Sequence, residues 1–282
     1  MKNKVWFITG CSSGFGRALA KQALERGNQV VVASRKLKDI QDILDHHKLA
    51  LGIELDMTKP EQLKAGVEKA IATFKRIDVL VNNAGIGYFA SLEESEEKVI
   101  RNMFEINFFG LSSLTQLVLP YMRKQKSGHI INISSIGGFV GFPALSFYNA
   151  TKFAVAGLSE ALAKEVSPLG IHVTIVCPSG FRTDWAGRSA SELKSHIEDY
   201  QATAETNKNT IRGSSGKQAG DPERAATAIL KVADTFQPPL YLLLGEAAYK
   251  NASKKLIDIK NDFEAWKETS VGADFPKQAI SE

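Results

Sequence analysis

Short apolar segments alternate along the chain with longer segments of helical periodicity. The apolar segments are rich in β-branched residues and lack polar alternation, which is typical of strands buried on both faces of a parallel sheet. Seven strands are predicted: Val5–Thr9, Gln29–Ala33, Leu51–Leu55, Val79–Asn82, His129–Ser134, His172–Cys177 and Leu240–Leu244. The amphipathic segments between the first six are Arg17–Arg26, Lys38–His47, Pro60–Lys75, Glu96–Lys124 and Tyr148–Val166.

This order predicts an α/β fold: a Rossmann-type, doubly wound, parallel seven-stranded sheet with helices on both faces. Neither an internal repeat nor an interdomain linker is visible, so residues 1–282 are expected to form a single Rossmann domain. Residues 186–220 interrupt the pattern and are rich in Ser, Thr, Asn, Lys and Gly, which predicts a mobile helix-and-loop insertion on the substrate side. Residues 245–282 are predicted to form a C-terminal helical extension.

Composition narrows the functional class. A formal charge of +4 without a long basic run argues against a nucleic-acid partner. Only two cysteines occur, Cys11 and Cys177, far apart, so neither a disulfide framework nor a metal site is expected. The apolar run Val5–Ile8 is too short for an export signal, and no stretch has the roughly 18 apolar residues of a membrane helix. We therefore expect a cytoplasmic protein that does not insert in a membrane.

The first predicted strand runs into a turn with glycines at positions 10, 14 and 16. In a doubly wound sheet, ligands bind outside the carboxyl ends of the strands. Free backbone N–H groups and the helix dipole at such a turn favour a pyrophosphate. A glycine turn kept only for packing is the alternative, but its position between the first strand and a helix favours dinucleotide binding.

The end of the second predicted strand bears on which nicotinamide cofactor binds. An NAD site usually places a carboxylate here, which would repel a 2′-phosphate. This chain has Ser34, Arg35 and Lys36 instead, and a guanidinium can hold a phosphate through two hydrogen bonds. The sequence therefore favours NADP(H) over NAD(H), although a solvated loop arginine is the simpler alternative.

Tyr148 and Lys152 are four residues apart and share one face of a predicted helix. A free phenol has a pKa of about 10, and a close ammonium stabilises the phenolate. Such a pair can exchange a proton with an alcohol or an alkoxide, although this spacing alone is common on helix surfaces. Ser135 follows the fifth strand and can reach the same edge of the sheet. Asn107 lies in an apolar helical stretch, so it is either a hydrogen-bonded core residue or a catalytic one.

Together these motifs resemble the classical short-chain dehydrogenase/reductase family over about residues 4–184. The resemblance rests on Thr9-Gly10-x-x-x-Gly14-x-Gly16, Asn82-Asn83-Ala84-Gly85, Asn107, Ser135, Tyr148-x-x-x-Lys152 and Pro178-x-Gly180-x-x-x-Asp184. It implies that Tyr148 exchanges the proton and that Ser135 orients the substrate oxygen. It also implies that Lys152 lowers the pKa of Tyr148 and holds the nicotinamide ribose, and that Asn107 anchors a water in a relay to Lys152.

The resemblance also assigns cofactor-binding residues. Beside Tyr148 and Lys152, the implied set is Gly10, Ser12, Ser13, Gly14, Phe15 and Gly16 at the phosphates, Arg35 at the 2′-phosphate, Asp56 and Met57 at the adenine, Asn83, Ala84 and Gly85 at the nicotinamide ribose, and Pro178, Gly180, Phe181 and Thr183 over the nicotinamide. One position departs from the family pattern, because Ser179 stands where the family usually has glycine. The turn after Pro178 is therefore the one place where the backbone geometry is in question.

The reaction expected from the resemblance is NADP-dependent interconversion of a carbonyl and a primary or secondary alcohol. A hydrophobic substrate is expected because aromatic residues gather near the predicted pocket: Tyr88, Phe89, Phe139, Phe142, Phe181 and Trp185. The alternative is that several of these aromatic residues belong to the core. The motifs look most like the branch containing 17β-hydroxysteroid and retinol dehydrogenases. A non-catalytic NADP-binding sensor or interaction protein is the alternative, and an isomerase or dehydratase using the same tyrosine is another. The family resemblance also implies a homodimer or homotetramer assembled through Glu96–Lys124 and Tyr148–Val166.

Overall fold

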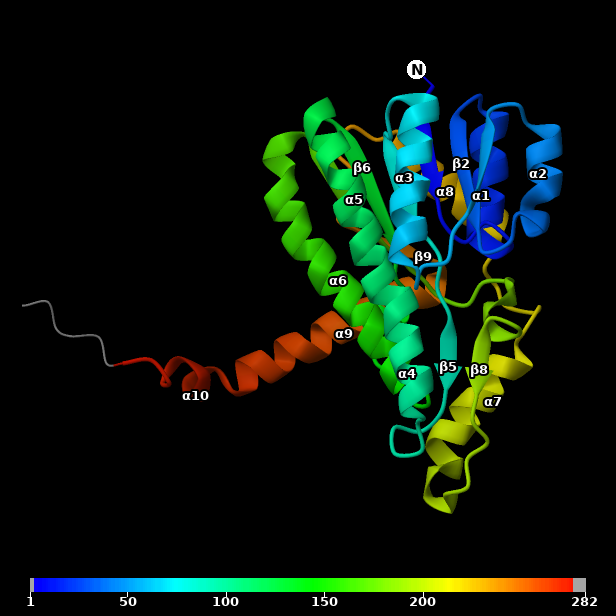
Figure 1. The fold of residues 1–282 in the computed structure, drawn as a ribbon. Coiled ribbons are helices and arrows are strands. Elements are labelled where there is room, and N and C mark those ends of the chain that lie inside the picture. Colours follow the sequence, from blue (N-terminus) through cyan, green and yellow to red (C-terminus); the bar gives the residue numbers. More distant parts are fainter. Residues whose placement is uncertain (1–2, 276–282) are drawn as a thin grey trace, which may run out of the picture.

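The seven predicted apolar segments form one parallel sheet in the computed structural model, which describes residues 3–275 (Figure 1). The strand order is β3-β2-β1-β4-β6-β7-β9, and every neighbouring pair is parallel. The strands are β1 (Val5–Ile8), β2 (Gln29–Ser34), β3 (Ala50–Glu54), β4 (Val79–Asn82), β6 (Gly128–Ile133), β7 (Ile171–Pro178) and β9 (Tyr241–Leu244). The predicted doubly wound, single-domain Rossmann-type fold is confirmed.

Helices cover both faces of this sheet because successive strand residues point to opposite sides. Trp6 and Ile8 pack in a cluster with α1 (Gly14–Glu25) and α8 (Pro222–Ala233), whereas Phe7 packs on the other face. That second face is covered by α3 (Pro60–Phe74), α5 (Gly110–Gln125) and α6 (Ser146–Val166). The strand order reverses between β1 and β4, so the carboxyl ends of these strands form the crevice in which doubly wound proteins bind ligands.

Three local features differ from the sequence prediction. The segment predicted as one helix, Glu96–Lys124, is divided into α4 (Glu97–Phe104), a π-helical turn (Glu105–Phe109) and α5. A 3₁₀ turn (Leu37–Ile40) precedes α2 (Gln41–His46). The strands β5 (Gly87–Phe89) and β8 (Ala190–Glu192) pair in a second, two-stranded sheet that was not predicted. Three-residue strands are too short to show a period in the sequence.

The insertion at 186–220 contains several short elements. After β8 come a 3₁₀ turn (Glu198–Tyr200), a π-helical turn (Gln201–Glu205) and α7 (Thr206–Gly213). Three further 3₁₀ turns lie earlier in the chain than β8, at Ile136–Gly138, Ser167–Leu169 and Asp184–Ala186. Because β8 pairs with β5, the insertion is anchored to the segment that follows β4.

The C-terminal extension begins directly after β9. It consists of α9 (Glu246–Ala265) and α10 (Lys267–Val271), which run away from the rest of the protein (Figure 1). The start of α9 is packed through Ala248 and Ala252, and most of the described residues beyond it are exposed. Residues 276–282 of the predicted extension lie outside the described residues. Across residues 3–275, no helix has the length and apolar character needed to cross a membrane.

Candidate active site

A cleft of about 1350 Å³ opens at the carboxyl ends of the central strands. Its walls come from the turn after β1, the ends of β2 and β4, the segment after β6, the start of α6 and the segment after β7. All the predicted site residues line this cleft except Gly16 and Asn107. Residues separated by more than 170 positions in the sequence therefore meet at one edge of the sheet.

The glycine turn after β1 is held against the end of β4. Gly10 and Gly14 have positive φ angles of 71° and 56°, a conformation that other residues rarely adopt. The Asn83 side chain donates hydrogen bonds from Nδ2 to the carbonyl oxygens of Thr9 and Gly10, at 2.8 and 3.1 Å. A Cβ atom on Gly16 would lie 2.4 Å from Asn83 Nδ2. Gly16 thus shapes the turn by close packing rather than by lining the cleft.

Cations gather where β2 ends. Arg35 is exposed and lines the cleft together with Lys36 and Lys38, and among these lining residues Asp39 is the neighbouring acid. At the next strand end, Asp56 Oδ1 accepts hydrogen bonds from both the backbone N–H and the hydroxyl of Thr58. The Asp56 carboxylate therefore shapes its own turn, and the cleft wall nearest Arg35 carries net positive charge.

Tyr148 and Lys152 are both buried at the inner end of the cleft. The Lys152 Nζ atom lies 5.8 Å from the centre of the Tyr148 ring and donates a hydrogen bond to the Ile133 carbonyl oxygen at 2.9 Å. Burial raises the pKa of the Tyr148 phenol, while the neighbouring Ser135 hydroxyl acts in the opposite direction. Burial also lowers the pKa of Lys152 to about 8. The expected lowering of the Tyr148 pKa by Lys152 stays a prediction.

Asn107 lies behind the cleft wall, fully buried in the π-helical turn. Its Oδ1 accepts the Ile86 N–H at 2.9 Å, and its Nδ2 donates to the Ile86 carbonyl at 2.9 Å and to Thr151 Oγ1 at 3.1 Å. The side chain therefore ties the segment after β4 to α6. A Cβ atom on Gly85 would lie 3.3 Å from Asn107 Oδ1 and 3.5 Å from Lys152 Nζ, so the two side chains converge there. The relay water predicted between them stays a prediction.

The turn after β7 accommodates Ser179 without backbone strain. In the described part of the chain, positive φ angles at non-glycine residues are limited to Lys75, Lys126 and Ala144. The Ser179 N–H donates to the Leu244 carbonyl oxygen at 3.0 Å, which ties the turn to the end of β9. Farther along, Phe181 packs edge-on against Phe15 of the glycine turn, with ring centres 5.0 Å apart. The departure from the family pattern therefore leaves the turn well supported.

The aromatic residues expected around the pocket divide into two groups. Phe142, Phe181 and Trp185 line the cleft, and the Trp185 ring lies 4.8 Å from the Tyr148 ring, centre to centre. The expectation was wrong for the other three residues. Tyr88 and Phe89 are buried in the cluster around β5, and Phe139 packs against Tyr241 beside α9. A strand at residues 87–89, invisible in the sequence pattern, turns the first two into core residues.

Several cleft residues were not identified from the sequence. They come mainly from the insertion and from α9, and include Asn207, Ile211, Ser214, Gln218, Ala247 and Asn251. No local motif marks these positions. The available signal was the insertion itself, because long irregular segments near a crevice often contribute to binding sites.

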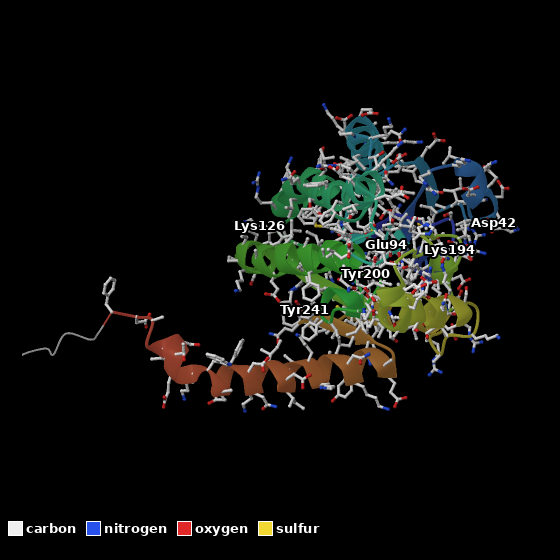
Figure 2. All side chains as sticks on the ribbon, turned by 90° about the horizontal axis from the view of Figure 1, so that it is seen from below. Asp42, Glu94, Lys126, Lys194, Tyr200 and Tyr241 are labelled. Carbon is white, nitrogen blue, oxygen red and sulfur yellow. The ribbon has the colours of Figure 1, made fainter. Side chains whose placement is uncertain are left out.

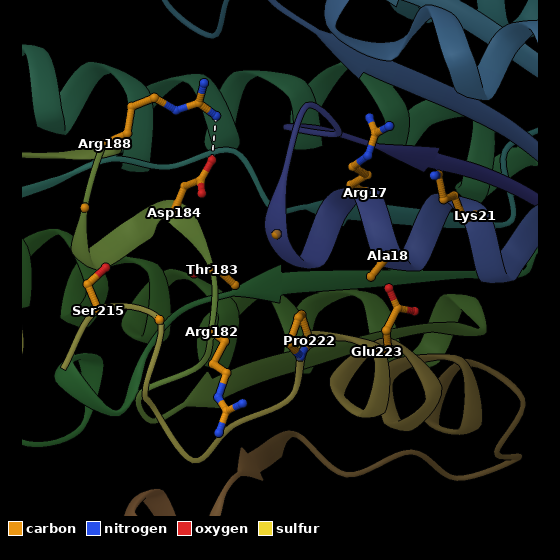
Figure 3. A pocket seen from close by; sticks show the side chains of 13 residues that line it. Arg17, Ala18, Lys21, Arg182, Thr183, Asp184, Arg188, Ser215, Pro222 and Glu223 are labelled. Carbon is orange, nitrogen blue, oxygen red and sulfur yellow. Dashed lines mark hydrogen bonds and ion pairs between the residues drawn. The ribbon is translucent and has the colours of Figure 1, made fainter.

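A smaller hollow of about 430 Å³ lies on the other side of the glycine turn, between α1 and the start of α8 (Figure 3). Four cations line it: Arg17, Lys21, Arg182 and Arg188. Two acidic partners engage three of them, since Asp42 pairs with Arg17 and Lys21, and Asp184 pairs with Arg188. Its charge is therefore largely compensated within the protein, unlike that of the cleft near Arg35.

The family assignment follows from comparison with known proteins. Residues 4–194 match the family model described as short chain dehydrogenase. The chain belongs to the short-chain dehydrogenase family. Oxidoreductase BOA17 of Botryotinia fuckeliana is 38% identical over 272 residues, covering 96% of this chain and 99% of that protein. The 3-ketodihydrosphingosine reductase of Bacteroides thetaiotaomicron is 39% identical, covering 87% and 89% of the two chains.

Solved structures of short-chain dehydrogenases agree with this assignment. A short-chain dehydrogenase from Streptomyces avermitilis superimposes with a TM-score of 0.91 at 38% identity, covering 97% of this chain and 100% of that one. Two more distant structures contain nicotinamide cofactors. One is a 3-ketoacyl-(acyl-carrier-protein) reductase from Brucella melitensis with NADH (TM-score 0.72, 27% identity, 86% and 95% coverage), and the other is ElxO with NADP (0.70, 28%, 86% and 96%). This short-chain dehydrogenase is accordingly an oxidoreductase.

Proposed function

We propose that the protein is an NADP-dependent oxidoreductase that interconverts a hydrophobic carbonyl compound and its alcohol, with Tyr148 as the acid and base. One observation carries the proposal: Tyr148, Ser135 and Lys152 share a single cleft with the glycine turn and Arg35. A proton-transfer group, a dinucleotide-binding turn and a phosphate-binding cation thus border the same space. A sensor would need the turn and the cation but not the proton-transfer group.

The cleft suits a dinucleotide with a 2′-phosphate. Glycines at positions 10 and 14 bring bare backbone to its surface, and Ser12 and Ser13 add hydroxyl groups there. Arg35, Lys36 and Lys38 supply positive charge at the end of β2, where an NAD site usually has an acid. When bound, the cofactor supplies or accepts the hydride.

The side chains at the inner end of the cleft supply orientation and the proton. The raised pKa keeps Tyr148 protonated at neutral pH, so its hydroxyl can donate to the oxygen of a carbonyl being reduced. The Ser135 hydroxyl lies beside the phenol and can donate to the same substrate oxygen. Lys152 contributes positive charge below its pKa of about 8, close to the expected nicotinamide ribose. Asn107 fixes Ile86 and so keeps this wall in place.

A hydrophobic substrate is supported by the lining near Tyr148. Trp185, Phe142, Leu145 and Ile211 border that end of the cleft. Apolar walls with a few polar groups favour an apolar molecule carrying one reactive oxygen. The similarity to a protein named 3-ketodihydrosphingosine reductase supports a ketone within this class.

Assembly and location form part of the same proposal. We expect a homodimer or homotetramer through Glu96–Lys124 and α6, where Phe109 of the π-helical turn and Phe153 of α6 are half exposed. Charge and composition agree with a protein of the cytoplasm that binds neither nucleic acid nor membrane.

Direct binding followed by turnover tests this proposal. We would measure the affinities for NADPH and NADH, and then NADPH oxidation with a panel of hydrophobic ketones and aldehydes. NADPH should bind more tightly, and Tyr148→Phe should reduce turnover at least about 100-fold while leaving NADPH affinity within about threefold. Product analysis must show one alcohol formed per NADPH consumed. A redox-neutral conversion of substrate would indicate an isomerase or dehydratase, and tight NADPH binding with no turnover on any carbonyl would favour a sensor.

A further inference from the structure

One buried side-chain oxygen at the edge of the cleft has no hydrogen-bond partner within the protein. Gln218 is 8% exposed, and its Oε1 accepts no hydrogen bond from any described residue. The described chain has three other buried side-chain atoms of this kind, Trp6 Nε1, Asn82 Oδ1 and Asn149 Oδ1, but none of those residues lines the cleft. A buried acceptor without a donor is unfavourable, because it loses its hydration and gains nothing in return. Gln218 does line the cleft, so a bound molecule can supply the missing donor.

The main chain fixes Gln218 beside the turn after β7. The Gly220 N–H donates to the Gly180 carbonyl oxygen at 3.1 Å, and the Arg182 N–H donates to the Gly220 carbonyl oxygen at 2.9 Å. The Arg182 side chain adds a hydrogen bond from Nε to the Gln218 carbonyl oxygen at 2.7 Å. A Cβ atom on Gly220 would overlap the Phe181 ring, so the two segments are in direct contact. Gln218 therefore has a defined place at the cleft, although it belongs to the irregular insertion.

Contacts farther along the insertion hold its outer part as well. Glu94 Oε1 accepts hydrogen bonds from the N–H groups of His196 and Ile197, at 2.6 and 3.2 Å, and the Tyr200 hydroxyl donates one to Glu93 at 2.8 Å (Figure 2). These bonds join the insertion to the segment that follows β5. The insertion is thus attached to the rest of the protein at both ends, so binding of a ligand by its last residues requires little additional ordering.

The Gln218 side chain lies beside the expected position of the nicotinamide. Its Cγ and Cβ atoms are 3.4 and 3.7 Å from the position that a Cβ atom on Gly180 would take. Gly180 belongs to the residues expected to cover the nicotinamide, and both residues line the cleft. The nicotinamide carboxamide carries an NH₂ donor. The other amino group of the cofactor is on the adenine, which is expected at Asp56 and Met57, in the opposite half of the sheet from β7. The carboxamide is therefore the cofactor donor within reach of Gln218.

We propose that Gln218 Oε1 accepts a hydrogen bond from the carboxamide NH₂ of bound NADP(H) and so orients the nicotinamide ring toward Tyr148. This inference rests on the proposed cofactor site and adds one residue to it. Protein atoms cover Oε1 in the structure, but the last side-chain bond of a glutamine turns easily. Because Oε1 has no hydrogen bond to lose, turning it toward the cleft breaks none of its contacts of that kind.

Cofactor analogues isolate the proposed hydrogen bond. We would measure by calorimetric titration how the wild-type protein and Gln218→Met bind NADP⁺, its 3-acetylpyridine analogue and 2′-phospho-ADP-ribose. The analogue has a methyl group in place of the carboxamide NH₂, and 2′-phospho-ADP-ribose lacks the nicotinamide. Methionine is about as long as glutamine but offers only a weak sulfur acceptor. We expect Gln218→Met to weaken NADP⁺ binding about tenfold and to change the other two affinities less than about twofold.

Gln201→Met is the matched control. It makes the same substitution on an exposed side chain of the insertion that does not line the cleft, so all three affinities should stay within about twofold of the wild type. Thermal unfolding without ligand tests for a structural role. Gln218→Met should unfold at the same or a higher temperature, because it removes an acceptor that has no partner. A lower unfolding temperature would show that Gln218 supports the fold instead, and would overturn the proposal.

The remaining outcomes separate this inference from the proposed function. Equal losses of affinity for the three ligands in Gln218→Met would mean that the residue only shapes the cleft, contrary to the proposal. Unchanged NADP⁺ affinity with a raised KM for a ketone would assign the amide to the substrate and also refute it. In both cases tight binding of NADP⁺ by the wild type would leave the proposed function standing. A wild-type protein that binds none of the three ligands would refute the proposed cofactor site and this inference together.

Discussion

The Lys152 side chain is buried, and its Nζ donates a hydrogen bond to the main-chain oxygen of Ile133 at 2.9 Å. No carboxylate is among the groups that shift its pKa; burial is the main one, and it lowers that pKa to about 8. A lysine held in this way costs folding free energy whenever it is charged, because its ammonium loses hydration that one hydrogen bond does not replace.

Replacing this lysine should therefore stabilise the protein at neutral pH. Lys152 is charged in the unfolded chain up to about pH 10.4, but in the folded protein only up to about pH 8. Folding stability should rise between these two values, where the unfolded state binds the extra proton. We expect Lys152→Met to gain about 2 kcal/mol at pH 7 and to lose that advantage by pH 10.5. Denaturant unfolding of both proteins across this range provides the measurement, and a constant difference would contradict it.

A methyl group on Gly16 should disrupt the dinucleotide-binding turn. The added Cβ would lie 2.4 Å from Asn83 Nδ2 and 2.5 Å from the Gly10 carbonyl oxygen, and backbone cannot move aside cheaply. We expect Gly16→Ala to weaken NADPH binding at least about tenfold and to lower stability by about 1–3 kcal/mol. Gly213→Ala serves as the control, because its Cβ would meet nothing within 4 Å. Calorimetric titration and thermal unfolding distinguish the two, and equal affinities would argue against this packing role.

Arg35 should set the preference between the two cofactors. Arg35→Asp would replace a phosphate-binding cation by a group that repels a 2′-phosphate and can accept hydrogen bonds from a ribose. We expect NADPH affinity to fall about 10- to 100-fold and NADH affinity to rise. Lys64→Asp makes the same charge change on the exposed surface of α3 and should leave the ratio of the two affinities unchanged. An unchanged ratio in Arg35→Asp as well would remove Arg35 from the proposed site.

His129 should make the protein sensitive to acid. Its ring is buried in β6 and accompanied by His172 and Lys4, and burial with these charges lowers its pKa to about 3. Above pH 6.5 the His129 ring is neutral in both the folded and the unfolded state. Below that pH the ring binds a proton in the unfolded chain but not in the folded protein. Stability should therefore fall by up to about 1.4 kcal/mol per pH unit from this residue alone. The slope of unfolding free energy against pH, from 6.5 to 4, should be shallower in His129→Gln.

The parts of the molecule that follow strong periods or short motifs could be predicted from the sequence. Fully apolar strands such as Val5–Ile8 and helices such as Pro60–Phe74 are recognisable because burial imposes their pattern. The glycine turn is recognisable because glycine adopts the positive φ angles at positions 10 and 14 far more readily than other residues.

Other features depend on contacts between distant segments. The pairing of β5 with β8 turns Tyr88 into a core residue, and no local pattern reveals it. Asn107 is similar: its partners Ile86 and Thr151 lie 21 and 44 positions away, so a core role and a catalytic role look alike in the sequence. Ala247 and Asn251 reach the cleft only because the last strand returns to the sheet edge beside β7.

The packing of α1 against α8 has a consequence for how the chain acquires its structure during synthesis. Gln22 in α1 hydrogen-bonds Glu223 and Thr227 in α8, and the apolar faces of these two helices share one cluster. When the glycine turn and α1 have left the ribosome, the nascent chain therefore still lacks α8, the helix that packs on α1. The ribosome must add about 200 further residues before that surface is covered. The apolar face of α1 therefore stays exposed, and open to chaperone binding, during that part of synthesis.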